Sequence, residues 1–144
     1  MDKFNEVITN FVNKSKEQML NITKDAIQEV IIDMQTPVKK GGKMRVKTGF
    51  LRHSGVSALN AFPEGEIVGR SRNKDDPKEG ELPEYKMEEN GVSASVIKTL
   101  LNMKIGDKFV YGWTAKYANI REIYDGFLVS ATDKWQQIVE KVSK

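Results

Sequence analysis

The chain is organised around the stretch Lys39-Lys40-Gly41-Gly42-Lys43-Met44-Arg45-Val46-Lys47-Thr48-Gly49-Phe50-Leu51-Arg52-His53-Ser54, inside a segment that runs from Met34 to Pro63. This segment holds six basic residues and no aspartate or glutamate. The whole chain has 23 basic and 20 acidic residues, so the other 17 basic residues are outnumbered by acids. One segment therefore produces the net charge of +3, and this clustering says more about partners than the small total does.

The first half of this stretch reads as a loop. Gly41-Gly42 follows Pro37 closely, which predicts a mobile loop at about 37–47. We interpret its cations and the next arginine as contacts for DNA phosphates or for a neighbouring subunit, with a solvated basic loop as the open alternative. These residues are Lys39, Lys40, Lys43, Arg45, Lys47 and Arg52. The aromatic content is low (Phe50, Phe62), which argues against base stacking on single strands.

Upstream of the loop, apolar residues recur at steps of three and four from Phe4 to Met34. This spacing predicts one long amphipathic helix that ends before Pro37. Thirty helical residues span about 45 Å, which is long for a domain of this size. Two arrangements stay open: the helix lies across its own sheet, or one end packs on the domain and the other on a neighbouring subunit.

Downstream, short helices and strands are expected in turn. A helical turn is predicted over 48–54 with Thr48 as its N-cap, followed by weak strands at 56–62 and 66–70. A second helix begins at the cap residue Ser93 and stops near Gly106. Its predicted apolar face consists of Val96, Ile97, Leu100 and Leu101.

The last third of the chain completes the fold prediction. Residues 108–113 predict a central strand from their aromatic and β-branched content, and 117–124 are ambiguous between helix and strand. From Asp125 one last helix is expected, with Phe127, Leu128, Ala131, Trp135, Ile138, Val139 and Val142 on one face. We therefore predict a single α+β domain over 1–144. Its long N-terminal helix and its C-terminal helix pack on a small, mostly antiparallel sheet.

Residues 73–90 differ from the rest in composition. They contain seven acids against three lysines, with two prolines and one glycine. Such a segment cannot bury enough apolar surface to order itself, so we predict a second mobile loop at 73–90.

Several protein classes are disfavoured by composition. The chain has no cysteine, which excludes disulfides, thiolate catalysis and cysteine-bound zinc. The apolar runs are only a few residues long, so no membrane helix and no membrane partner are expected. The N-terminus lacks a basic region followed by an apolar one, so no secretory signal is expected. We predict no cofactor.

Catalytic constellations are sparse. His53 is the only histidine and has no carboxylate near it in sequence, which favours a partly exposed turn residue over a general base or a zinc ligand. The acids Asp75, Asp76, Glu79 and Glu81 lack the spacing of a calcium loop. Asp76, Glu84 and Lys86 are similar to part of a metal-dependent nuclease site, the least favoured alternative. We therefore expect no enzymatic activity.

Two motifs carry a resemblance to a known family. The residues Lys47 to Ser54 resemble the Thr-Gly-x-Leu-Arg-x-Ser signature that follows the first long helix in neck, or tail-completion, proteins of tailed bacteriophages. The family's second half is a helix ending in Gly-Asp, a strand, then Tyr-Ala and an acidic residue, before a final helix. The matching positions here are Thr48, Gly49, Leu51, Ser54, Gly106, Asp107, Tyr117, Ala118 and Glu122.

The resemblance covers nearly the whole chain in order, spacing and length, with two departures. The family often has Glu-x-Gly after Tyr-Ala, whereas this chain has Glu122-Ile123-Tyr124-Asp125-Gly126. The charged segment 73–90 is the other departure.

The resemblance implies a structural virion protein without catalysis, which joins the phage tail to the DNA-filled head. It implies a homo-oligomeric ring, a hexamer by the family pattern, in the neck of the virion and in the host cytoplasm during assembly. The implied partners are the head connector or stopper, the tail terminator and genomic DNA in the channel. A basic DNA-binding module that uses residues 39–52 is the alternative.

Overall fold

The computed structural model of the chain describes residues 3–45, 50–63, 92–115 and 118–144. The predicted strand at 66–70 and the acidic segment 73–90, with the carboxylates weighed above as ligands, lie outside these ranges. So do Lys47, Thr48, Gly49 and Tyr117.

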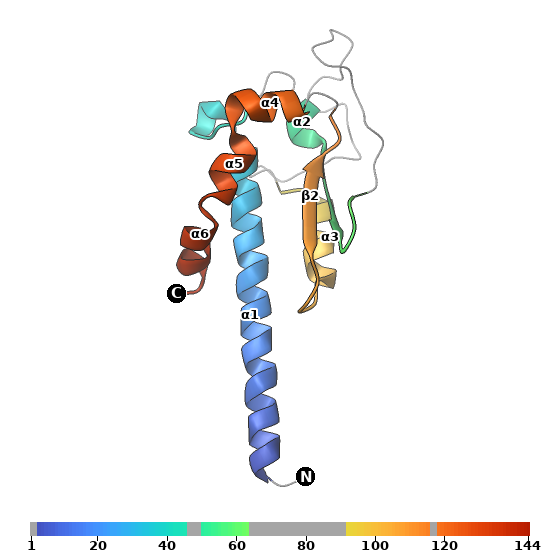
Figure 1. The fold of residues 1–144 in the computed structure, drawn as a ribbon, viewed down its shortest axis with the longest axis vertical. Coiled ribbons are helices and arrows are strands. Elements are labelled where there is room, and N and C mark those ends of the chain that lie inside the picture. Colours follow the sequence, from blue (N-terminus) through green and yellow to red (C-terminus); the bar gives the residue numbers. More distant parts are fainter. Residues whose placement is uncertain (1–2, 46–49, 64–91, 116–117) are drawn as a thin grey trace.

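The first helix, α1 (Lys3–Gln35), is the longest element and confirms the predicted N-terminal helix. In Figure 1 it runs along the long axis of the molecule, and its N-terminal half projects beyond the other described elements. Its buried residues all lie in its second half: Ala26, Val30, Ile31, Met34 and Gln35. The helix ends at Gln35 because Pro37 lacks a backbone N–H and disfavours a helical conformation at the residue before it.

The sheet consists of β1 (Gly55–Leu59) and β2 (Phe109–Trp113), which are antiparallel. Gly55 lies opposite Trp113 and Leu59 opposite Phe109. The chain between them contains α3 (Ala94–Asn102), which packs on β1 and places the Ser57 and Thr99 hydroxyl oxygens 2.9 Å apart. The predicted strand at 108–113 is confirmed as β2, and β1 is its neighbour among the described residues.

Helix α3 begins as predicted but presents a narrower apolar face. The Ser93 hydroxyl accepts a hydrogen bond from the Val96 N–H, which confirms Ser93 as the N-cap. Val96 and Leu100 are buried, whereas Ile97 is 38% and Leu101 76% exposed. The prediction was wrong for these last two residues. Helix α3 lies against the sheet and α1 with one face only, the face that Val96, Leu100 and Met103 share at steps of four and three.

The C-terminal part is helical and turns twice. Helix α4 (Ala118–Asp125) settles the ambiguous segment as helix, and Gly126, in the left-handed conformation (φ 66°), separates it from α5 (Phe127–Thr132). The predicted single last helix is wrong, because a turn at Asp133-Lys134 divides it into α5 and α6 (Trp135–Val142). At this turn the Lys134 N–H donates a hydrogen bond to the Ala131 carbonyl, three residues back. The change of direction allows α6 to pack on α1.

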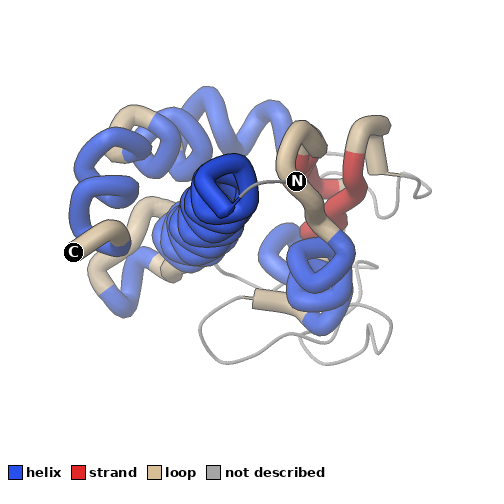
Figure 2. Tube along the Cα trace, turned by 90° about the horizontal axis from the view of Figure 1, so that it is seen from below, coloured by secondary structure: helices blue, strands red, loops and turns tan. Residues whose placement is uncertain are grey.

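The core lies on both sides of the second half of α1. Figure 2, which looks along α1, shows the sheet and α3 on one side of it and the C-terminal helices on the other. Contacts of α1 with α5 and α6 are supported by two ion pairs, Lys134–Asp33 and Lys141–Glu29. Trp113 of the sheet also meets Phe127 of α5 edge to face, with ring centroids 4.9 Å apart. The α+β class is thus confirmed.

Candidate assembly and DNA-contacting surface

The basic stretch forms a turn closed by backbone hydrogen bonds. A 3-10 helix, Val38–Lys40, ends at Gly41 in the left-handed conformation (φ 90°). The Val38 N–H donates to the Met44 carbonyl at 2.9 Å, and the Gly42 N–H donates to the Pro37 carbonyl at 3.0 Å. Met44 is fully buried beside Leu51, so the far end of the turn is anchored in the core. Backbone hydrogen bonds and the buried Met44 thus define the shape of the turn in this structure, and the mobility of residues 37–47 stays a prediction.

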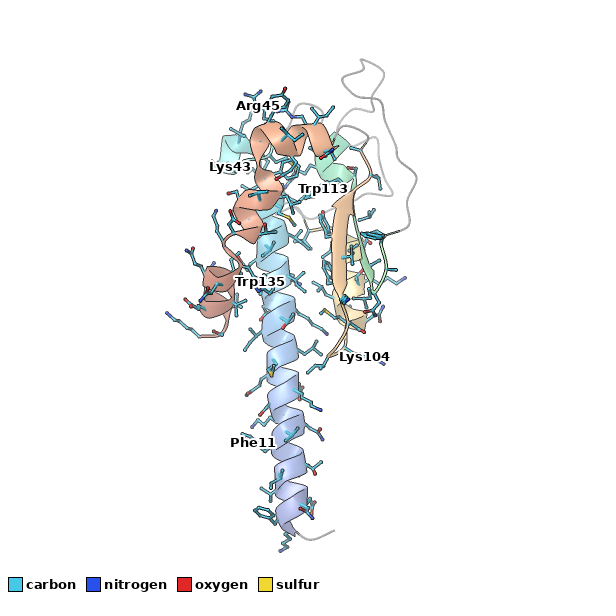
Figure 3. The ribbon with its side chains drawn as sticks, viewed as in Figure 1. Phe11, Lys43, Arg45, Lys104, Trp113 and Trp135 are labelled. Atoms are coloured by element: carbon cyan, nitrogen blue, oxygen red, sulfur yellow. The ribbon has the colours of Figure 1, made fainter. Side chains whose placement is uncertain are left out.

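This turn presents four cations to solvent: Lys39, Lys40, Lys43 and Arg45 are all exposed. Figure 3 shows Lys43 and Arg45 at the end of the molecule opposite to the N-terminus of α1, next to α4. Because neighbouring cations raise the local potential, this end of the molecule is suited to a polyanion or an acidic protein surface.

Arg52, grouped with these cations on sequence grounds, has a different position. It is half-buried in α2 (Phe50–His53), and its Nε donates a hydrogen bond of 2.8 Å to the backbone carbonyl of Gln35. Arg52 therefore ties α2 to the C-terminal end of α1, where the uncapped carbonyls of a helix favour a cation.

Sequence reasoning missed the residue that joins these elements, Gln35. Its side chain is fully buried, and its Nε2 donates to the Arg52 carbonyl at 2.8 Å and to the Tyr111 hydroxyl at 3.0 Å. Its Oε1 accepts from the Trp113 Nε1 at 2.9 Å. The available signal was its position four residues after Ile31, on the helix face that enters the core, where a polar residue needs partners.

The same cluster perturbs a tyrosine. The Tyr111 hydroxyl lies between Gln35 and Gly55, where a Cβ on Gly55 would be only 1.9 Å from it. Burial raises the pKa of Tyr111 well above its ordinary value, and the nearby Arg52 opposes this rise. The hydroxyl is therefore neutral at physiological pH.

The described residues of the first motif act inside the fold. Leu51 is buried, and the fully buried Ser54 donates its hydroxyl hydrogen to the Leu51 carbonyl at 2.8 Å. The Ser54 carbonyl in turn accepts from the Thr114 N–H at 2.9 Å, which extends the pairing of β1 with β2. Leu51, Arg52 and Ser54 thus dock α2 on the sheet and on α1.

The second motif closes the other end of the sheet. Gly106 adopts the left-handed conformation (φ 93°), and the Asp107 carboxylate accepts from the Lys104 N–H at 2.8 Å and from the Asn60 side-chain amide at 3.0 Å. These bonds, with that from Asn60 the larger cause, lower the pKa of Asp107. Asn60 Oδ1 accepts from the Lys108 N–H, so Asp107 and Asn60 together clamp the ends of both strands.

The third part of the resemblance lies in α4. Ala118 begins this helix and is half-buried, next to the core cluster of Met44, Leu51, Ala115 and Phe127. The Glu122 carboxylate accepts hydrogen bonds from the Leu128 and Val129 N–H groups at 2.8 and 3.0 Å. Glu122 therefore caps the start of α5 and stabilises its N-terminal dipole.

The described residues hold no group of three or more histidines, aspartates or glutamates placed to bind a metal ion. Within the described ranges, no helix is both long and apolar enough to span a membrane. The nuclease-like residues Asp76, Glu84 and Lys86 lie outside those ranges.

Comparison with protein-family models, with curated proteins and with solved structures found no match to this chain.

Proposed function

We propose that this chain is a structural virion protein of a tailed bacteriophage that joins the tail to the DNA-filled head. It acts without catalysis, as a ring of identical subunits in the neck, and meets the head connector or stopper on one side and the tail terminator on the other. It would be found in the virion neck, and in the host cytoplasm during assembly.

The observation that carries the proposal is the role of the residues behind the family resemblance. Leu51 packs in the core, Ser54 and Asp107 each bond two segments of the fold together, and Glu122 caps a helix. A signature whose members stabilise the fold is expected of a structural protein, since catalysis would require side chains free to reach a substrate. The residues that carry the family resemblance are thus residues that hold the fold together.

The exposed cations support DNA in the channel as a partner. Lys39, Lys40, Lys43 and Arg45 extend from one turn, and a ring would repeat them around its axis. The alternative, a free-standing DNA-binding module, uses the same turn without a ring.

Loss of the gene from the phage tests the proposal. We expect lysates that contain DNA-filled heads and finished tails, separate from one another, by negative-stain microscopy. Expression of the protein in trans restores joined particles. Normally joined particles in the absence of the protein would overturn the proposed function. Gene order gives an independent check, with portal and capsid genes upstream and tail genes downstream.

A further inference from the structure

The N-terminal half of α1 exposes an apolar surface that nothing in the described structure covers. We define the arm as Lys3–Met19; it ends before Leu20, which packs against the core. Phe4 and Phe11 are each 71% exposed, Val7 and Met19 64%, Ile8 45% and Val12 41%. Figure 3 shows Phe11 far out on this projecting helix. An exposed apolar surface of this extent marks a contact site for a partner.

The size of this surface corresponds to a protein interface. An aromatic side chain offers about 200 Å², so the two phenylalanines alone leave roughly 280 Å² open, and the four aliphatic residues add a similar area. The total is near the upper end of what monomers expose and approaches the roughly 800 Å² per partner of a stable interface.

The shape of the surface shows what kind of partner fits. At about 100° per residue, the six side chains cover an arc of roughly 140°, from Val7 through Phe11 to Val12. Two helices paired along a single seam bury a narrower stripe. The arm is therefore suited to a surface that wraps around it, such as the body of another subunit.

The same chain offers a second uncovered apolar surface. On α4, Ile120 is 45% exposed, Ile123 74% and Tyr124 73%, at the three- and four-residue spacing of one helix face. Figure 1 shows α4 at the end of the molecule opposite to the N-terminus of the arm. A head-to-tail contact between identical subunits requires two different surfaces on each chain, and the arm and α4 are two such surfaces.

We propose that the arm of each subunit docks on α4 of a second copy of this chain. The contact is heterologous, and its repetition from subunit to subunit forms a ring when the rotation between neighbours closes. This inference rests on the proposed function for the closed ring, and it names the two surfaces by which the ring is held.

Complementation between two variants tests the pairing. Phe11→Glu disables the arm and Ile123→Glu disables α4, while each leaves the other surface intact. In sedimentation experiments we expect the wild type to form an oligomer and each variant alone to be monomeric. An equimolar mixture of the two variants should form a dimer, since one intact arm meets one intact α4. Asn13→Glu adds the same charge to the opposite, exposed face of the arm and should sediment as the wild type does.

Three outcomes would overturn the inference. They are a monomeric wild type at all concentrations, an Ile123→Glu variant that still forms the full oligomer, and a mixture that stays monomeric. Phe11 and Ile123 are exposed, so both variants should fold, and Trp113 fluorescence checks this. A protein that oligomerises as expected but is not needed for joining heads to tails would overturn the proposed function alone. A protein needed for joining whose Phe11→Glu variant still oligomerises would overturn this inference alone.

Discussion

Gln35 connects three elements through one side chain, and its removal should be costly. The variant Gln35→Ala leaves the Trp113 N–H and the Arg52 carbonyl without their partner inside the protein. Since an orphaned buried polar group costs roughly 1–3 kcal/mol, we expect a loss of about 2–4 kcal/mol in the free energy of unfolding. Urea denaturation followed by tryptophan fluorescence measures it. Gln18→Ala, at an exposed position of the same helix, should change stability by less than about 0.5 kcal/mol.

Tyr111 makes stability depend on high pH. Its pKa is raised in the folded state relative to about 10 in the unfolded chain. The folded state therefore holds the hydroxyl proton more tightly, so this contribution is complete below pH 10 or so and is lost as the pH rises above it. We expect the urea midpoint to fall as the pH rises above about 10. Tyr111→Phe has no hydroxyl to ionise and should show a shallower fall; an equal fall in both proteins contradicts this prediction.

At the scale of elements, the two glycines of the sheet should respond in opposite ways. A Cβ at Gly55 would be 1.9 Å from the Tyr111 hydroxyl oxygen, whereas a Cβ at Gly112 meets nothing within 4 Å. We expect Gly55→Ala to destabilise the fold by about 1–3 kcal/mol, because a buried cluster must move. Gly112→Ala should leave stability unchanged or raise it by up to about 1 kcal/mol, because the unfolded chain loses freedom. The melting temperatures of the two variants test this prediction. Equal values would contradict the close contact between Gly55 and the Tyr111 hydroxyl.

The elements themselves were largely predictable, and the reasons are local. Helix α1, the Ser93 cap and β2 follow from periodicity, capping chemistry and β-branched content, all of which act over a few residues. The break between α5 and α6 was not predictable, because no proline or glycine marks it. The break arises because α6 packs on α1, with contacts such as the ion pair between Lys134 and Asp33, which are 101 residues apart in the sequence.

The residues of the candidate site were likewise predictable only in part. Exposure of the cations at 39–45 follows from their charge, so it was foreseen. The inward position of Arg52 depends on the Gln35 carbonyl, and the role of Gln35 depends on Tyr111 and Trp113, which lie 76 and 78 residues further along the chain. These hydrogen-bond partners cannot be predicted without knowing how the sheet packs on α1.

On the scale of the whole molecule, the basic turn and the arm lie at opposite ends. The turn, rather than the arm, is therefore expected to carry the affinity for DNA. We expect Lys43→Gln with Arg45→Gln to lower the slope of log affinity against log salt by about 1.8 on duplex DNA, because two phosphate contacts are lost. Filter binding over a range of salt concentrations measures the slope.

The matched control removes two cations from elsewhere. Lys98→Gln with Lys108→Gln takes the same charge from exposed positions outside the turn, and should leave the slope near that of the wild type. An equal reduction in both double variants would show that net charge, rather than the turn, governs DNA affinity.

The packing of α1 against α5 and α6 has a consequence for synthesis. Helix α1 leaves the ribosome well before α5 and α6, so this side of the core cannot close until those later helices have been made. Until then both the core face and the arm of α1 are open to unwanted association. Helix α4 is held in place through Glu122 and α5, so the surface proposed to receive an arm forms at the same late moment. Until α5 has been made, a chain can therefore offer an arm to another copy but cannot receive one.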